Sequence, residues 1–336
     1  MNAKKWLMDL QNMKNKPAIP VLSFPCVSLM GITVKDLVSS SDLQAKGMKL
    51  VADRVPSGAS VSMMDLSVEA EAFGSAIRVE EMEVPAVMDV IVHDEDEAAA
   101  LKVPPVGAGR TGAYVEAIGK AVELITDRPV FAGMIGPFSL TGRLVGVSDA
   151  MVYCYDEPEM IHVVMEKSTE FLIAYAKAYK AVHAAGVVMA EPLTGLLSPG
   201  LAEEFSHPYV KRIIDAVQDD AFQVIYHNCG NSTVKMLDSL GKLGAAAYHF
   251  GNKVDMKEIV ETMPEGMIAM GNVDPSSQFR NGTPASITEE TKRIMGECCK
   301  NKNFIISSGC DIPPATPWEN IDAFFAAVES FYKEQA

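Results

Sequence analysis

The sequence predicts an α/β fold, a closed (β/α)8 barrel, and three observations lead to that prediction. Short β-forming apolar runs recur along the chain, and the stretches between them carry apolar residues at the three- and four-residue spacing of amphipathic helices. A strand followed by a helix, repeated, is typical of a parallel sheet with helical crossovers. Eight such runs in 336 residues fit a closed barrel better than an open doubly wound sheet.

The eight expected strands are short and are separated by the helical stretches. In chain order they are IPVLSF ending at Phe24, SVSMMD ending at Asp65, PVFAGMIG ending at Gly136, GVVMAE ending at Glu191, FQVIYHN ending at Asn228, AAAYHF ending at Phe250, MIAMGN ending at Asn272 and FIISSG ending at Gly309. Between residues 65 and 121, IRVEEMEVPAVMDVIV predicts an irregular hairpin and VPPVGAGRTG predicts a loop. We interpret this region as a large insertion after the second strand.

The expected helices are clearest in the second half of the chain. They cover residues 157–184, 201–217, 233–240, 256–263, 287–299 and 317–333. No low-complexity segment, charge block or Ser/Gly linker marks a boundary. We therefore predict one barrel domain over residues 1–336, with an N-terminal helical extension.

Composition excludes several classes of function. A net charge of −15 and a pI near 4.9 argue against a general binder of nucleic acid or anionic membranes, because phosphates attract clusters of lysine and arginine. Small molecules or proteins are the expected partners. The chain has no apolar run of about 18 residues and no signal-peptide pattern, so we expect a cytoplasmic protein. Its six cysteines then indicate burial, catalysis or metal binding rather than disulfides.

The carboxyl ends of barrel strands form the usual active-site rim, and two of these ends carry soft metal ligands. In VIYHNCG, His227 and Cys229 are two residues apart and so point to the same side of an extended strand. Cys310 follows the last expected strand, and a barrel brings it to the same rim. Two sulfurs and an imidazole suit Zn²⁺ and leave a fourth position open for a substrate thiol, which fits alkyl transfer to sulfur. The alternative is that these are ordinary core residues, since free cysteine is often buried.

Other polar residues at the expected strand ends are further candidates. Glu191 could be a fourth zinc ligand or a base that takes the thiol proton, or it could cap the helix or loop that follows it. Asp65 could orient a loop or a metal-binding histidine, or it could lie in the cleft as a cofactor-binding residue. Asn272 and Asp274 could bind a polar group of the substrate or cofactor, or form an Asx turn before Pro275.

Five stretches resemble a known family: YHNCGN, GNVDPSSQF, SSGCDIPPATPWENI, MDLSVEAEAFG and AEPLTGLLSP. Together they are similar to the uroporphyrinogen decarboxylase superfamily, and specifically to its branch of methylcobamide:coenzyme M methyltransferases. The resemblance covers the chain from about Asp65 to the C-terminus. It implies a barrel of that type in which His227, Cys229 and Cys310 bind a zinc that activates an acceptor thiol. It also implies a corrinoid protein as the partner that presents methylcobamide.

The resemblance leaves two other functions open. Uroporphyrinogen decarboxylase itself would need an arginine-rich RQAGR-like motif, whereas PCVSLMGITV after the first expected strand has no arginine. A non-catalytic module that binds a corrinoid protein is the second alternative. If the acceptor is coenzyme M, its sulfonate needs a cation or backbone amides, for which Arg143, Lys253, Arg280 and the helix start after Cys310 are candidates.

Overall fold

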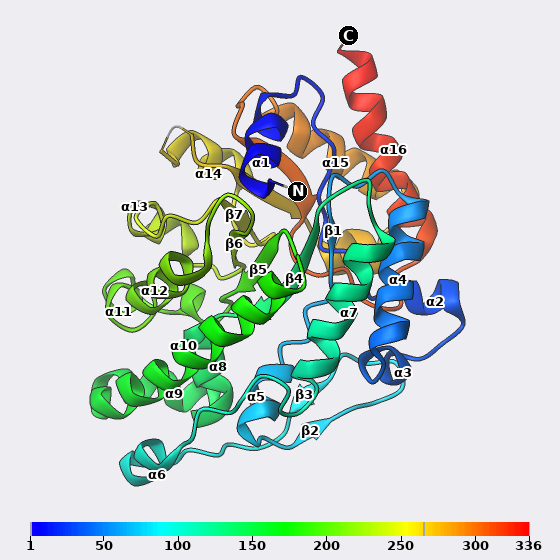
Figure 1. Cartoon of the computed structure of the whole chain (residues 1–336). Coiled ribbons are helices and arrows are strands. Elements are labelled where there is room, and N and C mark those ends of the chain that lie inside the picture. The colour runs from blue at the N-terminus through cyan, green and yellow to red at the C-terminus, as the bar shows by residue number, and fades with distance from the viewer. Residues whose placement is uncertain (1, 265, 336) are drawn as a thin grey trace.

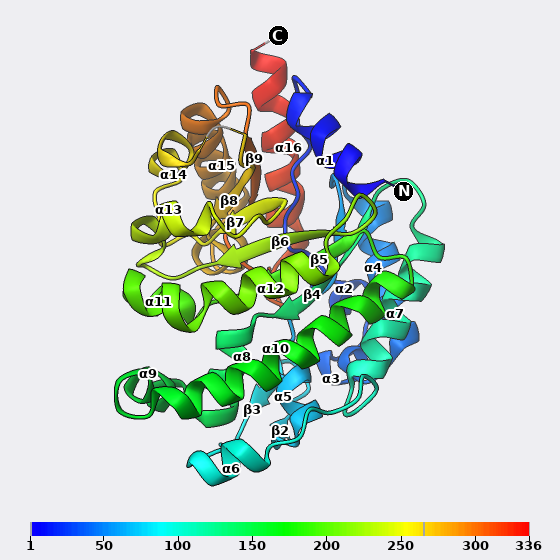
Figure 2. The ribbon, with the colours of Figure 1, turned by 60° about the vertical axis from the view of Figure 1, so that its left-hand side comes forward.

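A curled parallel sheet surrounded by helices forms the centre of the molecule (Figures 1 and 2). The structure, a computed structural model, describes residues 2–264 and 266–335. Seven strands neighbour one another in chain order: β1 (Ser60–Val61), β4 (Val130–Ile135), β5 (Gly186–Ala190), β6 (Gln223–Asn228), β7 (Ala247–Phe250), β8 (Ala269–Val273) and β9 (Phe304–Ser308). All six pairings are parallel, as helical crossovers require.

The predicted first strand, IPVLSF, is wrong as a regular strand, but its residues lie where an eighth strand would be. The Ile19 amide donates to the Ile306 carbonyl of β9 at 3.1 Å, and the Gly58 amide donates to the Ala18 carbonyl at 2.9 Å. The segment therefore joins β9 to the start of β1 and completes the ring. Pro20 has no amide hydrogen, which interrupts any regular ladder at this point. The predicted barrel is confirmed in this form.

Helices cover the outside of the sheet, and further helices lie at both ends of the barrel. The α-helices are α1 (Ala3–Asn12), α2 (Cys26–Met30), α3 (Val34–Val38), α4 (Ser41–Arg54), α5 (Val68–Phe73), α6 (Glu95–Ala100), α7 (Thr111–Leu124), α8 (Pro137–Val145), α9 (Val147–Asp156), α10 (Pro158–Ala181), α11 (Pro199–Phe205), α12 (His207–Val217), α13 (Leu237–Leu240), α14 (Met256–Thr262), α15 (Pro284–Cys298) and α16 (Trp318–Glu334). Shorter helical turns are η1 (Thr194–Leu196), η2 (Thr233–Met236) and η3 (Pro275–Arg280). None of the described helices is both long enough and apolar enough to cross a membrane.

Most helices expected in the second half are present within a few residues of their predicted limits. The helix expected over residues 201–217 is instead two helices, α11 and α12. They separate at Ser206 because Pro208 lies in the first turn of α12, where the missing amide hydrogen is tolerated. The expected hairpin is present as the antiparallel pair β2 (Ile77–Arg78) and β3 (Ala86–Val87).

The two ends of the barrel are covered differently. At the amino ends of the strands, α1 packs Ala3, Leu7 and Leu10 against interior residues that include Val61 and Phe131. This apolar contact closes that end. The hairpin, α5, α6 and α9 lie at the opposite end (Figures 1 and 2), where the strands finish and the polar residues gather.

Candidate metal centre

The interior of the barrel is layered, and the layer nearest the carboxyl ends is polar. Ile225, Ala247 and Ile305 belong to the apolar interior cluster that α1 covers. Two positions further along the same strands come three buried polar residues, His227, His249 and Ser307. Residues i and i+2 of a strand share a face, so these polar side chains point into the barrel above the apolar layer.

His227, Cys229 and Cys310 meet at this level. Their ligand atoms all lie within 4.8 Å of one another, and the Cys310 Sγ lies 3.6 Å from the His227 Nε2. A tetrahedral zinc with Zn–S of about 2.3 Å and Zn–N of about 2.0 to 2.1 Å would separate the sulfur and nitrogen by about 3.6 Å. The donor set and its spacing therefore fit a zinc ion without rearrangement of this pair.

The two thiols of the cluster act as one hydrogen-bonded pair. The hydrogen bond with Cys310 lowers the pKa of Cys229 below its ordinary value, although burial works against it. The same bond and burial raise the pKa of Cys310 to about 12. Cys229 is therefore the thiol of the pair that loses its proton more readily, and a bound cation would favour the loss of both protons.

A second histidine, His249, lies behind His227. The two Nδ1 atoms are 2.7 Å apart, and the ring planes are inclined at 61° with centroids separated by 4.7 Å. Burial and the neighbouring His227 lower the pKa of His249 well below its ordinary value, so its ring is neutral. From the sequence, His249 at the end of its expected strand could face the cleft or be satisfied by a backbone partner. Ser307 is not singled out by the sequence, because its role depends on which strands are neighbours.

Glu191 follows β5 and is completely buried, but its oxygens are already occupied. Oε1 accepts from the Phe138 amide at 2.8 Å, and Oε2 accepts from the Ser139 amide and hydroxyl and from the Thr194 hydroxyl. The amides belong to the first turn of α8, where a carboxylate caps the orphan donors of the helix. This geometry favours capping over a place among the metal ligands, but the capped helix α8 precedes β5 in the chain instead of following it.

Asn272 and Asp274, at the end of β8, support the neighbouring loops. The Asn272 amide donates to the carbonyls of Gly251 and Val254 at 3.0 and 2.9 Å. Asp274 Oδ1 accepts from the first amides of η3 in an Asx turn, and its Oδ2 accepts from Asn252. Both residues line a cavity of about 220 Å³ whose lining does not include the three metal-ligand candidates.

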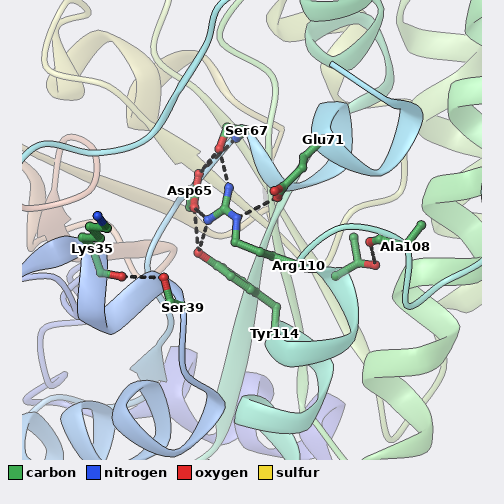
Figure 3. A network of polar contacts seen from close by, with 9 residues as sticks. Lys35, Ser39, Asp65, Ser67, Glu71, Ala108, Arg110 and Tyr114 are labelled. Carbon is green, nitrogen blue, oxygen red and sulfur yellow. Dashed lines mark hydrogen bonds and ion pairs between the residues drawn. The ribbon is translucent and has the colours of Figure 1, made fainter. Parts of the chain in front are cut away.

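Asp65, at the rim beyond β1, belongs to a buried ion-pair network (Figure 3). Its Oδ2 accepts from Arg110 at 2.5 Å and from the Tyr114 hydroxyl at 2.6 Å, and its Oδ1 accepts from Ser67. The Arg110 Nε donates to Glu71 at 2.6 Å. Although burial opposes the charge, Asp65 and the neighbouring groups raise the pKa of Arg110 above its usual value.

This network joins the segment between β1 and β4 to the barrel, and the sequence does not reveal it. Arg110 comes from the GAGRTG loop and Tyr114 from α7, whereas Asp65 follows β1. Every oxygen of Asp65 has a donor within the network, so the carboxylate holds Arg110 instead of facing an open cleft. The arginine lies 45 residues from its partner, and that separation gives no periodic signal.

Comparison with known proteins shows the family to which the chain is similar. The family model of uroporphyrinogen decarboxylase (URO-D) matches residues 13–331. The chain belongs to the uroporphyrinogen decarboxylase family. A methylcobamide:CoM methyltransferase, MtbA, from Methanosarcina acetivorans is 28% identical over 80% of this chain and 78% of its own. A uroporphyrinogen decarboxylase from Prochlorococcus marinus is 27% identical over 63% of this chain and 61% of its own.

Solved structures support the barrel of this family. A methyltransferase from Methanosarcina mazei superposes with a TM-score of 0.85 at 23% identity and covers 99% of both chains. The resemblance predicted from the five stretches is confirmed, because the family model matches nearly the whole chain and the relatives include methylcobamide:CoM methyltransferases.

Proposed function

We propose that this chain is a zinc-dependent methyltransferase that moves a methyl group from a methylated corrinoid protein to a thiol acceptor such as coenzyme M. The observation that carries the proposal is the convergence of His227, Cys229 and Cys310, with ligand atoms within 4.8 Å, at the carboxyl end of a barrel. Relatives named as methylcobamide:CoM methyltransferases support the corrinoid donor and the thiol acceptor. The proposal covers residues 1–336 as one barrel domain with α1 as its N-terminal extension.

Three protein ligands suit a catalytic zinc rather than a structural one. A zinc ion bound there would supply a cation that keeps a substrate thiol deprotonated near neutral pH. His227 is buried, whereas Cys229 and Cys310 are partly exposed, so the open position lies on the side of the two sulfurs. The barrel walls then orient the substrate sulfur toward the mouth, where the methyl donor docks.

The remaining residues support this centre instead of reacting. Glu191 caps α8, and the Asp65–Arg110 network anchors the insertion beside the mouth. In this proposal a separate corrinoid protein holds the cobamide and this chain holds the thiol. All six cysteines are free, which supports a cytoplasmic, reducing location.

The test uses purified protein, free methylcobalamin and a panel of thiols. Zinc-loaded protein is expected to contain about one zinc per chain and to convert methylcobalamin and coenzyme M to the methyl thioether, and chelation should abolish the reaction. Decarboxylation of uroporphyrinogen by the chelated protein, with no use of methylcobalamin, would instead identify the decarboxylase of the family. Binding of a corrinoid protein without any thioether would identify the non-catalytic module.

A further inference from the structure

A chain of three hydrogen bonds runs from the proposed metal ligand His227 to the first segment of the barrel. The Nδ1 of His227 lies 2.7 Å from the Nδ1 of His249. The Nε2 of His249 lies 2.8 Å from the Ser307 hydroxyl, which donates to the Ile19 carbonyl at 2.7 Å. All three side chains are at most 3% exposed, so water does not replace any of these partners.

The direction of each bond follows from its last acceptor. A carbonyl oxygen can only accept, so the proton of Ser307 points to Ile19. The Ser307 oxygen must then accept from His249, which places the His249 proton on Nε2. His249 is only 2% exposed, and such burial disfavours a second, charge-carrying proton, so its Nδ1 is bare and can only accept a hydrogen bond. The proton between the two rings belongs to His227.

This order leaves His227 with a proton on Nδ1 and a lone pair on Nε2. The Nε2 is the atom that faces Cys310, at 3.6 Å from its sulfur. A metal ligand must present an unprotonated nitrogen, and the tautomer is set by the hydrogen bond at the other nitrogen. In the opposite tautomer the Nε2 would carry a proton and could not bind a metal.

The register of the sheet produces this arrangement. His227 and His249 are paired across β6 and β7, so their inward side chains are direct neighbours. Ser307 lies on β9, which only β8 separates from β7, and its hydroxyl lies within hydrogen-bond distance of the His249 Nε2. Side chains that only filled the core at these positions would not need to form a continuous series of hydrogen-bond donors and acceptors.

We propose that His249 and Ser307 are positioning residues that hold His227 in the tautomer and orientation required for metal binding. Neither residue touches the substrate or the metal. The inference rests on the proposed zinc site but not on the methyl-transfer reaction. It predicts how the zinc affinity and the tautomer of His227 change in variants of His249 and Ser307, and both are measured without catalytic turnover.

The first experiment compares zinc dissociation constants, measured by competition with a chromophoric chelator. His249→Leu removes the acceptor and should weaken zinc binding about 10- to 100-fold, whereas His249→Asn keeps an acceptor at the Nδ1 position and should restore most of the affinity. Ser307→Ala should lie between them. Ser308→Ala is the matched control, because Ser308 also bonds the first segment, at the Val21 amide, but is not part of this chain of bonds.

The second experiment reads the tautomer directly from ¹⁵N NMR of the metal-free protein. His227 should carry its proton on Nδ1 in the wild type and in His249→Asn, and should gain the Nε2-protonated form in His249→Leu. Protonation of Nε2 in the wild type would overturn the proposal, as would equal zinc affinity in His249→Leu and the wild type. Because the NMR measurement needs no zinc, a protein that binds no metal would refute the zinc site while this measurement still tests the tautomer.

Discussion

Two parts of the barrel rim use polar residues in opposite ways. At the ends of β6 and β9, His227, Cys229 and Cys310 converge with no carboxylate or guanidinium among their ligand atoms. Beside β1, Asp65 and Arg110 are surrounded by donors and acceptors that satisfy one another. The His227, Cys229 and Cys310 cluster keeps lone pairs available for a metal ion, whereas the oxygens of Asp65 are already hydrogen-bonded.

The difference shows why residue type at a strand end does not identify a functional group by itself. Asp65 and Glu191 are buried acids in the expected places, yet their oxygens are consumed by Arg110, Tyr114 and the first turn of α8. A buried carboxylate must be compensated, so it tends to serve the structure that compensates it. The thiols and the imidazole cost less to bury and can remain available to a ligand.

The largest effect is expected from Cys310→Ser. This change should reduce bound zinc from about one per chain to near none, and it should slow methyl transfer by about 10³-fold or more, because the metal charge is worth several kcal/mol. Metal analysis and the methylcobalamin assay provide the two measurements. Cys299→Ser is the control, since Cys299 is partly buried beside Tyr332 and should leave zinc and rate unchanged. A Cys310→Ser protein with full zinc and full rate would refute the proposed centre.

The next effect tests the other part of the rim. Arg110→Met leaves Asp65, whose side chain is fully buried, without a counter-charge and should lower the free energy of unfolding by about 3 to 5 kcal/mol while zinc is retained. Urea unfolding measures the loss. Arg78→Met breaks an exposed pair with Glu80 and should cost at most about 1 kcal/mol. Loss of zinc without loss of stability in Arg110→Met would mean that the two regions are not separate.

The buried acid Glu69, near this network, should make the free energy of unfolding depend on pH. Burial raises the pKa of Glu69 to about 7, and its Oε2 has no hydrogen-bond partner. The folded state therefore holds a proton that the unfolded state releases, so stability should fall as the pH rises from about 5 to about 7 and then level off.

Replacing Glu69 isolates its share of this slope. Urea unfolding of Glu69→Gln between pH 5 and 8 should lack a contribution of about 3 kcal/mol that the wild type loses over this range. Glu329→Gln, at an exposed pair with Lys333, should keep the wild-type slope. An unchanged slope in Glu69→Gln would assign the pH dependence to other groups.

The smallest effect concerns recognition of the thiol substrate. Arg143 on α8 is partly buried, burial lowers its pKa, and the described residues include no ion-pair partner for it. If it binds the sulfonate, Arg143→Gln should raise KM for coenzyme M about 10-fold and leave KM for neutral 2-mercaptoethanol unchanged. Arg212→Gln, which removes an exposed pair with Glu166, is the control. Equal changes for both thiols would exclude a charge-specific role.

Much of the second half of the fold is predictable because its helices are long and amphipathic. α10, α15 and α16 match their expected ranges, and each has 15 to 24 residues over which the apolar spacing can be read. The first half is harder because its elements are short. β1 has two residues, and the extended segment through Ile19 closes the ring without a ladder of its own.

For the candidate site, the local spacing in HNC predicts that His227 and Cys229 share a face, because strand geometry alone requires it. Their approach to Cys310 follows from the barrel. The sequence could not indicate that Arg110 neutralises Asp65, because the GAGRTG loop has no periodicity that places it beside β1.

The sequence by itself determined the alternation of strands and helices, the soft ligands at two strand ends and the family, because these depend on the order and type of neighbouring residues. Only the tertiary structure decided that His249 lies behind His227 and that Glu191 caps α8. Those outcomes depend on which strands pair and in which register. Hydrogen bonds act over about 3 Å, and chain order does not specify distances of that size between segments far apart.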